Sequence, residues 1–336
     1  MTGPLINICI PTYNGEEYIT QCIQSALGQT YTNIEILFVD DCSTDNTLGI
    51  IESFAKTDNR IKLVRNEKNL GLVANWNKCI DIAKGEWIKF LFQDDYLDID
   101  CIEVMLQGVS PNDKLITSGR RLIFDPGLYE ATKKYSINET LSFERLGINA
   151  QKPVSISPEK ISSLVVSNLC MNFIGEPTVV MFRKEVTKEV GLFNNDLYQI
   201  CDLEYFLRIG TKYGVKYIPK PLSYFRVHRK STSSSHMKDK LFTLAHIDPV
   251  VNSHQLLYSP RFASFRSSLS ALQKMRLNLF FRERVHEAQT MVSTFGKENI
   301  DRFEFICNKY PEIGANRRGN IFIKLIFQVI KLRRAI

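Results

Sequence analysis

Short apolar runs alternate with helical patterns over the first hundred residues of this 336-residue chain. The apolar runs cover residues 5–10, 34–39, 61–65 and 87–92. Between them, apolar positions recur at helical spacing over 17–27, in the stretch after Thr44 and Asp45, and over 72–83. This alternation predicts an α/β fold, in which a mostly parallel sheet is joined by right-handed helical crossovers.

Carboxylates gather where two of these apolar runs end. Asp40 and Asp41 follow the second run, and Asp94 and Asp95 follow the fourth. Because ligands bind at the carboxyl ends of parallel strands, we expect both pairs and the turn 11–14 to converge on one cleft. A divalent cation and a phosphorylated ligand would neutralise such a cluster. The alternative for each pair is an ordinary solvated turn or a helix cap.

The chain after residue 100 is less regular. Residues 125–160 are rich in polar and turn-forming residues, which predicts a long excursion that covers an acceptor site. A strand over 178–182, a helix over 202–213 and a strand over 216–218 follow, and the sequence from about 238 onward is mostly helical.

Three carboxylates in this second part are candidates for a general base. They are Glu176, Asp202 and Glu204. A base that takes a proton from a hydroxyl must be a carboxylate or similar group within hydrogen-bond reach. Glu176 also has a structural interpretation as a surface group and Asp202 as a helix N-cap, and the sequence does not rank the three.

A basic run with one histidine follows an apparent strand. Arg226, His228 and Arg229 lie in it. The run is either a solvated loop or a cationic loop that folds over a diphosphate and stabilises it as it leaves.

Composition narrows the class of protein. The eight cysteines form no Cys-x-x-Cys pair and no export signal is recognisable, so we expect reduced thiols, no structural zinc and a cytoplasmic location. The net charge of +7 favours anionic partners. No apolar stretch reaches the length of about 20 residues that spans a bilayer, and no pattern indicates nucleic-acid binding.

The carboxyl-terminal tail, residues 317–336, is apolar with interspersed Arg and Lys. It predicts either an amphipathic helix on an anionic membrane surface or a helix packed on the core or in a dimer contact. The sequence is compatible with a homo-oligomer and does not determine the oligomeric state.

Several short motifs occur in a fixed order. They are Pro-Thr-Tyr-Asn at 11–14, Val-Asp-Asp-Cys-Ser-Thr-Asp at 39–45, Asn-Leu-Gly at 69–71 and Gly-Glu-Trp-Ile at 85–88, all before Asp94 and Asp95. Together they resemble family 2 glycosyltransferases of the GT-A fold over roughly residues 4–235. Members of that family are inverting, metal-dependent transferases that use nucleotide-sugars, mostly UDP-sugars.

The resemblance implies roles for individual residues. The nucleotide pocket would be lined by Pro11, Thr12, Tyr13 and Asn14, and the base contacted by Asp41 and Asn75. Asp94 would hold the ribose or the metal, Asp95 the metal, with His228 as a further ligand. Asp202 would be the catalytic base. Two positions depart from the family pattern, since Phe92 replaces the first acid of Asp-x-Asp and Cys201 replaces the Glu of Glu-Asp.

We therefore expect a GT-A domain over 1–235, with a nucleotide-binding half over about 1–100 and an acceptor-binding half over about 101–235. A helical extension with a basic tail would occupy 236–336. The expected activity is inverting transfer from a nucleotide-sugar, most simply a UDP-sugar, to a hydroxyl of a glycan or lipid-linked saccharide, with Mn²⁺ or Mg²⁺. Such an enzyme would serve surface polysaccharide or glycoconjugate synthesis at the cytoplasmic face of a membrane.

Two rival functions fit the same fold. A sugar nucleotidyltransferase would be expected to carry a Gly-rich basic loop after the first strand, whereas residues 11–17 are acidic. A non-catalytic glycan- or membrane-binding subunit would have no need to keep acids at Asp41, Asp94, Asp95 and Asp202.

Overall fold

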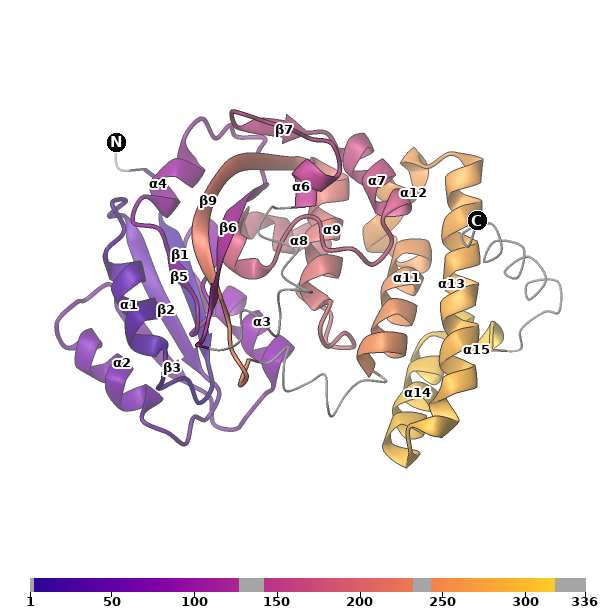
Figure 1. Ribbon diagram of the computed structural model, residues 1–336, viewed down its shortest axis with the longest axis horizontal. Coiled ribbons are helices and arrows are strands. Elements are labelled where there is room, and N and C mark those ends of the chain that lie inside the picture. Colours follow the sequence, from indigo (N-terminus) through magenta and orange to yellow (C-terminus); the bar gives the residue numbers. More distant parts are fainter. Residues whose placement is uncertain (1–2, 127–141, 232–242, 318–336) are drawn as a thin grey trace. The chain divides into compact units, whose positions relative to one another are not determined.

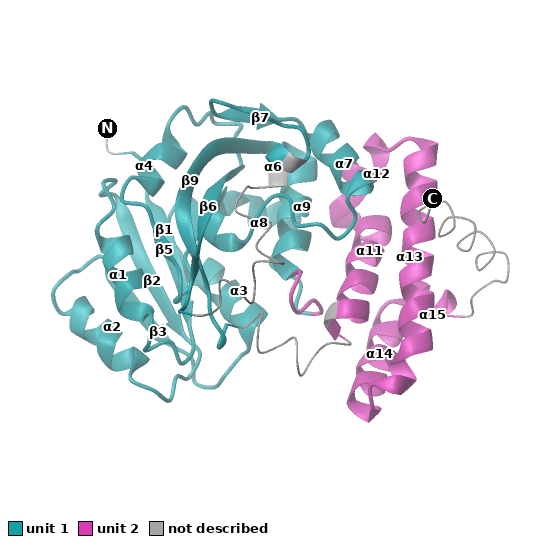
Figure 2. Cartoon of the chain, in the orientation of Figure 1, with its two compact units in different colours: residues 1–195, 201–234 teal, residues 196–200, 235–336 magenta. Residues whose placement is uncertain are grey.

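The computed structural model describes residues 3–126, 142–231 and 243–317, and the statements below concern these. The chain forms two compact units (Figure 2). The first comprises residues 1–195 and 201–234, and the second comprises 196–200 and 235–336. Each unit is described by itself.

The first unit is built on a mixed sheet, which has nine strands among the described residues (Figure 1). Its order is β3 (Ile61–Arg65), β2 (Ile34–Asp40), β1 (Ile6–Thr12), β4 (Trp87–Phe90), β8 (Val180–Arg183), β6 (Leu115–Phe124), β9 (Val215–Val227) and β5 (Tyr96–Leu97), with β7 (Val154–Ile156) paired to β9. The first four strands are parallel, and β8 joins β4 to β6 in antiparallel pairings. The predicted α/β fold with a mostly parallel, mixed sheet is confirmed.

Helices cover both faces of this sheet. Side chains alternate along β1, so Ile8 and its like-facing neighbours pack with α1 (Ile19–Leu27), α2 (Thr47–Ala55) and α4 (Cys101–Leu106). On the other face Cys9 contacts α3 (Leu72–Ile82). Phe182 of β8 packs edge-on against Tyr205 of α9 (Cys201–Tyr213). The shorter helices are α6 (Ser142–Arg145), α7 (Pro158–Ser167), η1 (Pro177–Val179), η2 (Lys184–Val186) and α8 (Thr187–Val190).

Several element boundaries differ from the sequence prediction. β1 continues through Pro11, and β4 ends at Phe90 rather than at residue 92. The helix after β2 starts at Thr47, and the predicted strand over 178–182 begins as a 3₁₀ turn. Residues 127–141 of the predicted excursion lie outside the described residues.

The largest difference concerns β9, which extends well beyond the strand predicted over 216–218 and includes the prolines at 219 and 221. β9 runs unbroken beside β6 as a long curved strand (Figure 1). The register shifts on either side of Gly119, opposite Pro221. A Cβ at Gly119 would lie 2.8 Å from the Pro221 nitrogen, so this irregularity accommodates a proline that a regular ladder would reject.

The second unit is helical, as predicted. Its elements are η3 (Thr243–Ile247), α11 (Asp248–Tyr258), η4 (Pro260–Phe262), α12 (Ala263–Ser268), α13 (Ala271–Met291), η5 (Val292–Thr294), α14 (Lys297–Lys309) and α15 (Pro311–Ala315). A capping box between Ser270 and Gln273 starts α13. In the described part of the chain, every helix is too short or too polar to cross a membrane. Most of the predicted membrane-contacting tail, 318–336, lies outside the described residues.

Candidate active site at the carboxyl ends of the strands

The loops that follow β1 and β2 are bonded to each other. Asn14 has a φ of 48°, a conformation that Asn tolerates better than most residues. Its N–H donates to Ser43 Oγ at 2.9 Å, and its Oδ1 accepts from the Thr44 N–H at 2.8 Å. The predicted nucleotide-pocket turn 11–14 is therefore fixed to the acidic loop by side-chain-to-backbone bonds.

The two adjacent acids at the end of β2 have different hydrogen-bond partners. Asp40 is fully buried and accepts from the Ser43 N–H at 2.9 Å, so it closes its own turn. Asp41 accepts from the Leu70 N–H at 2.7 Å and from the Gly71 N–H at 2.9 Å. Asp41 thus holds the loop that leads into α3.

Asn66 joins Asp41 to Asn75, and no pattern in the sequence pointed to Asn66. Its Nδ2 donates to Asp41 Oδ1 at 2.8 Å and to Asn75 Oδ1 at 2.9 Å, while Asn75 donates to the Val39 carbonyl at 3.0 Å. All three polar side chains are buried. The two residues that the family resemblance assigns to the base lie in one bonded cluster, and their contact with a base stays a prediction.

Phe92, at the position of the missing first acid, is a packing residue. Its ring stacks on Trp76 with centroids 4.8 Å apart. The next residue, Gln93, exchanges two hydrogen bonds with the Tyr13 backbone, at 2.9 and 3.0 Å. The β4 loop and the β1 loop are therefore locked together beside the acids that follow.

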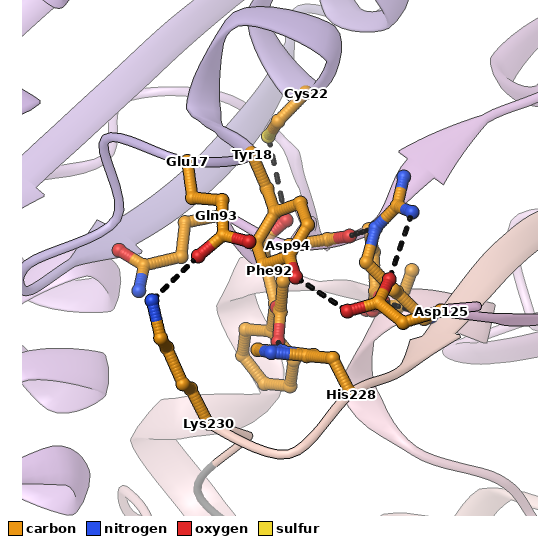
Figure 3. A network of polar contacts seen from close by, with 12 residues as sticks. Glu17, Tyr18, Cys22, Phe92, Gln93, Asp94, Asp125, His228 and Lys230 are labelled. Atoms are coloured by element: carbon orange, nitrogen blue, oxygen red, sulfur yellow. Dashed lines mark hydrogen bonds and ion pairs between the residues drawn. The ribbon is translucent and has the colours of Figure 1, made fainter. Parts of the chain in front are cut away.

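Asp94 and His228 meet directly (Figure 3). Asp94 Oδ2 lies 2.9 Å from His228 Nε2. The His228 side chain is 6% exposed and the Asp94 side chain 24% exposed, so the pair is reachable from solvent on the Asp94 side. Two of the three predicted metal ligands are thus brought together.

Asp95 is held differently from Asp94. Its Oδ2 accepts from Thr178 Oγ1 at 2.7 Å and its Oδ1 from the Arg226 N–H at 2.9 Å. Burial, together with the charge of Asp94, raises the pKa of Asp95. Both oxygens are used within the protein, and the predicted metal role of Asp95 stays a prediction.

Arg226, a predicted diphosphate candidate, is engaged by the protein. Its Nε donates to the Asp94 carbonyl at 3.1 Å and its Nη2 to Gln21 Oε1 at 2.6 Å. The guanidinium lies over the Tyr18 ring. Tyr18 donates to Asp125 at 2.7 Å (Figure 3). Burial and the bond to Asp125 raise the pKa of Tyr18. Arg226 therefore ties the end of β9 to α1, a role that only the folded contacts reveal.

The cations after His228 face solvent. Lys230 Nζ lies 2.9 Å from Glu17 Oε2, an exposed pair, and Arg229 is exposed beside it. The hydrogen bond from Lys230 lowers the pKa of Glu17. Such an exposed pair contributes little to stability. The predicted contact of Arg229 with a diphosphate stays a prediction.

The three candidate bases are in different surroundings. Glu204 is buried and paired with Arg208 at 2.8 Å, and Glu176 is paired with Arg120. Asp202, the second residue of α9, accepts from the neutral amide of Asn172 at 3.2 Å. A carboxylate beside a guanidinium is a weaker base, which counts against Glu204 and Glu176.

The segment 172–178 connects Asp202 to the acids after β4. Asn172 binds Asp202 at one end, and Thr178 binds Asp95 at the other. An extended chain of that length spans at most about 20 Å. One short segment therefore contacts both Asp202 and Asp95. No sequence pattern pointed to Asn172 or Thr178.

Comparison with known proteins identifies the family. The model of glycosyl transferase family 2 matches residues 7–189. An uncharacterized protein of Mycobacterium tuberculosis, MT1568, is 30% identical over 74% of this chain and 77% of its own length. The glycosyltransferase GlyG of Streptococcus pneumoniae is 37% identical over 36% of this chain and 40% of its length. The putative teichuronic acid biosynthesis glycosyltransferase TuaG of Bacillus subtilis is 33% identical over 37% of this chain and 57% of its length.

Solved structures share the fold. Residues 1–349 of TarS from S. aureus, in complex with UDP-GlcNAc, superpose with a TM-score of 0.57 at 16% identity, over 93% of this chain and 89% of that one. The mannosyltransferase PcManGT from Pyrobaculum calidifontis, in complex with GDP-Man and Mn²⁺, gives 0.53 at 15% identity, over 96% and 82%. At such identities the likeness shows the fold alone.

The fold and the sequence matches define a glycosyltransferase of the GT-A type. The chain belongs to glycosyl transferase family 2. The resemblance predicted from the motifs is thereby confirmed, whereas the matches leave the donor and acceptor unassigned.

Proposed function

We propose that this chain catalyses inverting transfer of a sugar from a UDP-sugar to a hydroxyl of a glycan or lipid-linked saccharide. The Asp94–His228 pair at the ends of the strands is the observation that supports this most. It lies in the same unit as Asp202, the candidate base, and as the Asp41–Asn75 cluster. The relative TuaG, which is named for teichuronic acid biosynthesis, supports a polysaccharide acceptor.

A divalent cation fits the chemistry of the Asp94–His228 pair. Carboxylate oxygen and imidazole nitrogen are both ligands that Mn²⁺ accepts. Among the described residues no cluster of three or more His, Cys, Asp or Glu side chains could hold a metal, so the diphosphate and water would complete the coordination. We therefore assign Asp94 and His228 as the protein ligands, with Asp95 as their support. A bound cation would offset the charge that develops on the departing diphosphate.

Asp202 accepts the proton of the attacking hydroxyl in this mechanism. As the O–H bond breaks, the oxygen bonds to the anomeric carbon. The bond from that carbon to the diphosphate oxygen breaks on the opposite side, and its electron pair leaves with the nucleoside diphosphate. A single displacement of this kind inverts the anomeric centre. Asn172 keeps the Asp202 carboxylate oriented through the hydrogen bond at 3.2 Å.

We place this reaction at the cytoplasmic face of a membrane, on a lipid-linked acceptor. Residues 235–336 hold 17 of the 43 Lys and Arg residues but only 8 of the 36 Asp and Glu residues. A segment with that excess is attracted to anionic headgroups. Co-sedimentation with phosphatidylglycerol vesicles, compared with phosphatidylcholine vesicles, tests the placement. Equal binding to both would contradict it.

The decisive experiment is calorimetric titration with UDP, GDP and dTDP, each with and without Mn²⁺. Three results together would support the donor class and the cation site. UDP binds only when Mn²⁺ is present, GDP and dTDP do not bind, and Asp94→Asn no longer binds UDP. The corresponding UDP-sugars are then tested for turnover. Binding without turnover would favour a binding subunit, and failure of a folded protein to bind any nucleotide would refute the proposal.

A further inference from the structure

A short segment of the second unit leads directly into the helix that carries Asp202. Residues 196–200 interrupt the sequence of the first unit, yet their contacts assign them to the second. Ile200 is followed by Cys201, the first residue of α9, and then by Asp202. Whatever fixes this segment therefore acts, through the peptide chain, on the first turn of α9.

One buried carboxylate holds the end of the segment nearest α9. Asp248, the first residue of α11, is fully buried. Its Oδ1 accepts from the Tyr198 N–H at 3.0 Å, and its Oδ2 accepts from the Gln199 N–H at 2.7 Å and the Ile200 N–H at 3.3 Å. Three successive backbone donors thus converge on one side chain and set the path of the chain up to Cys201.

The other end of the segment is held by α14 and the residue that follows it. Asp196 is 5% exposed. Its Oδ2 lies 2.6 Å from Lys309 Nζ and also accepts from the Tyr310 hydroxyl, and its carbonyl accepts from Arg302 at 3.0 Å. Both ends of 196–200 are therefore anchored by helices of the carboxyl-terminal extension.

Keeping a charge at Asp248 works against stability. Burial raises its pKa to about 6, although the three N–H donors and the charge of Arg302 act in the opposite direction. A carboxylate that is ionised at neutral pH in spite of burial is not the most stabilising choice for this position. Its benefit is the defined path that it gives to 198–200.

We propose that Asp248 is a positioning residue for Asp202, so that the helical extension takes part in catalysis by fixing the segment 196–200. The proposal rests on the proposed function, in which Asp202 is the base. Displacing a catalytic group by about 1 Å costs roughly 100-fold in rate. Loss of the anchor is therefore expected to lower kcat while leaving nucleotide binding to the β1, β2 and β4 loops unchanged.

The test compares full-length variants. Asp248→Ala removes the acceptor for all three N–H donors, Asp248→Asn keeps one acceptor oxygen, and Tyr310→Phe removes one donor to Asp196. Glu287→Gln is the matched control, because it removes a carboxylate of the second unit whose partner, Arg284, lies on the same helix. The readouts are amide hydrogen exchange of the peptide 196–203, Mn²⁺-dependent UDP affinity, and kcat with the UDP-sugar that is turned over.

Asp248→Ala is expected to lower kcat about 10- to 100-fold, to speed exchange in 196–203 and to leave UDP affinity within about twofold. Asp248→Asn and Tyr310→Phe should show smaller changes in the same direction, and they decide the question if the alanine variant does not fold. Unchanged kcat with unchanged exchange would overturn the proposal. A parallel loss of UDP binding and kcat would also overturn it, since that indicates general destabilisation.

The two proposals fail in different ways. If Asp202→Asn is inactive while both Asp248 variants keep full kcat, Asp202 stands as the base and Asp248 does not position it. If the wild-type protein binds no nucleotide, the proposed function falls. Unchanged exchange of 196–203 in Asp248→Asn and Tyr310→Phe would then refute the anchoring itself.

Discussion

Asp94 Oδ2 and His228 Nε2 lie 2.9 Å apart although their residues are 134 positions apart in the sequence. The neighbouring residues set this distance. The Arg226 N–H donates to Asp95 at 2.9 Å, which fixes the end of β9 beside the β4 loop. His228, two residues further on, is then carried to Asp94. The two acids after β4 thus have different roles. Asp95 accepts the hydrogen bond that holds the end of β9, and Asp94 contacts His228.

Asp94→Asn and His228→Gln should each weaken Mn²⁺-dependent UDP binding. Loss of groups that only support metal ligands costs about 10- to 100-fold in affinity, so loss of a ligand should cost at least as much. Titration calorimetry at fixed Mn²⁺ measures the effect. Adding EDTA to the wild-type protein should reproduce it.

His254→Gln is the control for this prediction. His254 Nε2 lies 2.9 Å from Glu312 Oε2, which is the same kind of pair in the second unit. It should leave UDP binding unchanged. If His228→Gln behaved like His254→Gln, the Asp94–His228 pair would not be the cation site.

Asn172→Ala should lower kcat by roughly tenfold, because one hydrogen bond to a charged group contributes about 1.5–3 kcal/mol at most. The Asn172 Nδ2 donates to Asp202 and to the Gly175 carbonyl, and the Asn172 Oδ1 accepts from the Gly175 N–H. UDP affinity should not change. Steady-state kinetics beside Asn168→Ala, whose amide donates within its own helix region, would show whether the effect is specific.

Part of this site was readable in the sequence. The alternation of strands and helices placed Asp41 and Asp94 at one edge of the sheet, and the motifs identified the family. The different roles of Asp94 and Asp95 were not readable, because the two acids lie in a hydrogen-bonded turn, where the alternation of a strand does not set side-chain directions.

Other parts could not be read from one sequence. Asn172 and Thr178 owe their roles to contacts with Asp202 and Asp95 that are 30 and 83 positions away. Such pairings depend on how distant segments pack, which no local pattern encodes. The prolines of β9 are a case in which tertiary pairing overrides a local preference. Proline disfavours a continuous strand, yet β9 pairs with β6 along its length across the irregularity at Gly119.

Thr178→Val should destabilise the first unit by about 1–3 kcal/mol, because it removes a donor from a buried carboxylate without changing the side-chain shape much. Asp95 is 2% exposed, so water does not readily replace the hydroxyl. Urea denaturation measures the change. Thr187→Val is the comparison, since its hydroxyl only donates to the Lys184 carbonyl at 2.8 Å. Equal effects of the two substitutions would argue against a special bond to Asp95.

Phe92→Asp restores the acid of the family pattern, and we expect it to harm the protein. The ring it replaces stacks on Trp76 at 4.8 Å, so the change should cost about 3 kcal/mol in stability. Mn²⁺-dependent UDP affinity should not improve. Phe92→Leu, which keeps an apolar side chain, should lose much less stability. A gain in metal affinity in Phe92→Asp would show that this position reaches the cation site.

The pH dependence of stability should differ between the wild-type protein and Asp248→Asn. Burial raises the pKa of Asp248 from 3.8 to about 6, so the folded protein binds this proton more tightly than the unfolded chain does. The stabilisation that this proton provides is complete below about pH 4 and is lost as pH rises through 6. A shift of that size corresponds to about 3 kcal/mol.

Asp248→Asn has no titrating carboxyl at this position and so lacks the stabilisation from the bound proton. The free energy of unfolding of the wild type minus that of the variant should therefore fall between pH 4 and pH 7. Urea denaturation at several pH values measures the difference. Burial lowers the pKa of His246 and of His254 in the second unit, but these groups are common to both proteins and cancel in the subtraction. A difference that does not change with pH would mean that Asp248 keeps its ordinary pKa, and the argument that its charge is retained at a cost in stability would fail with it.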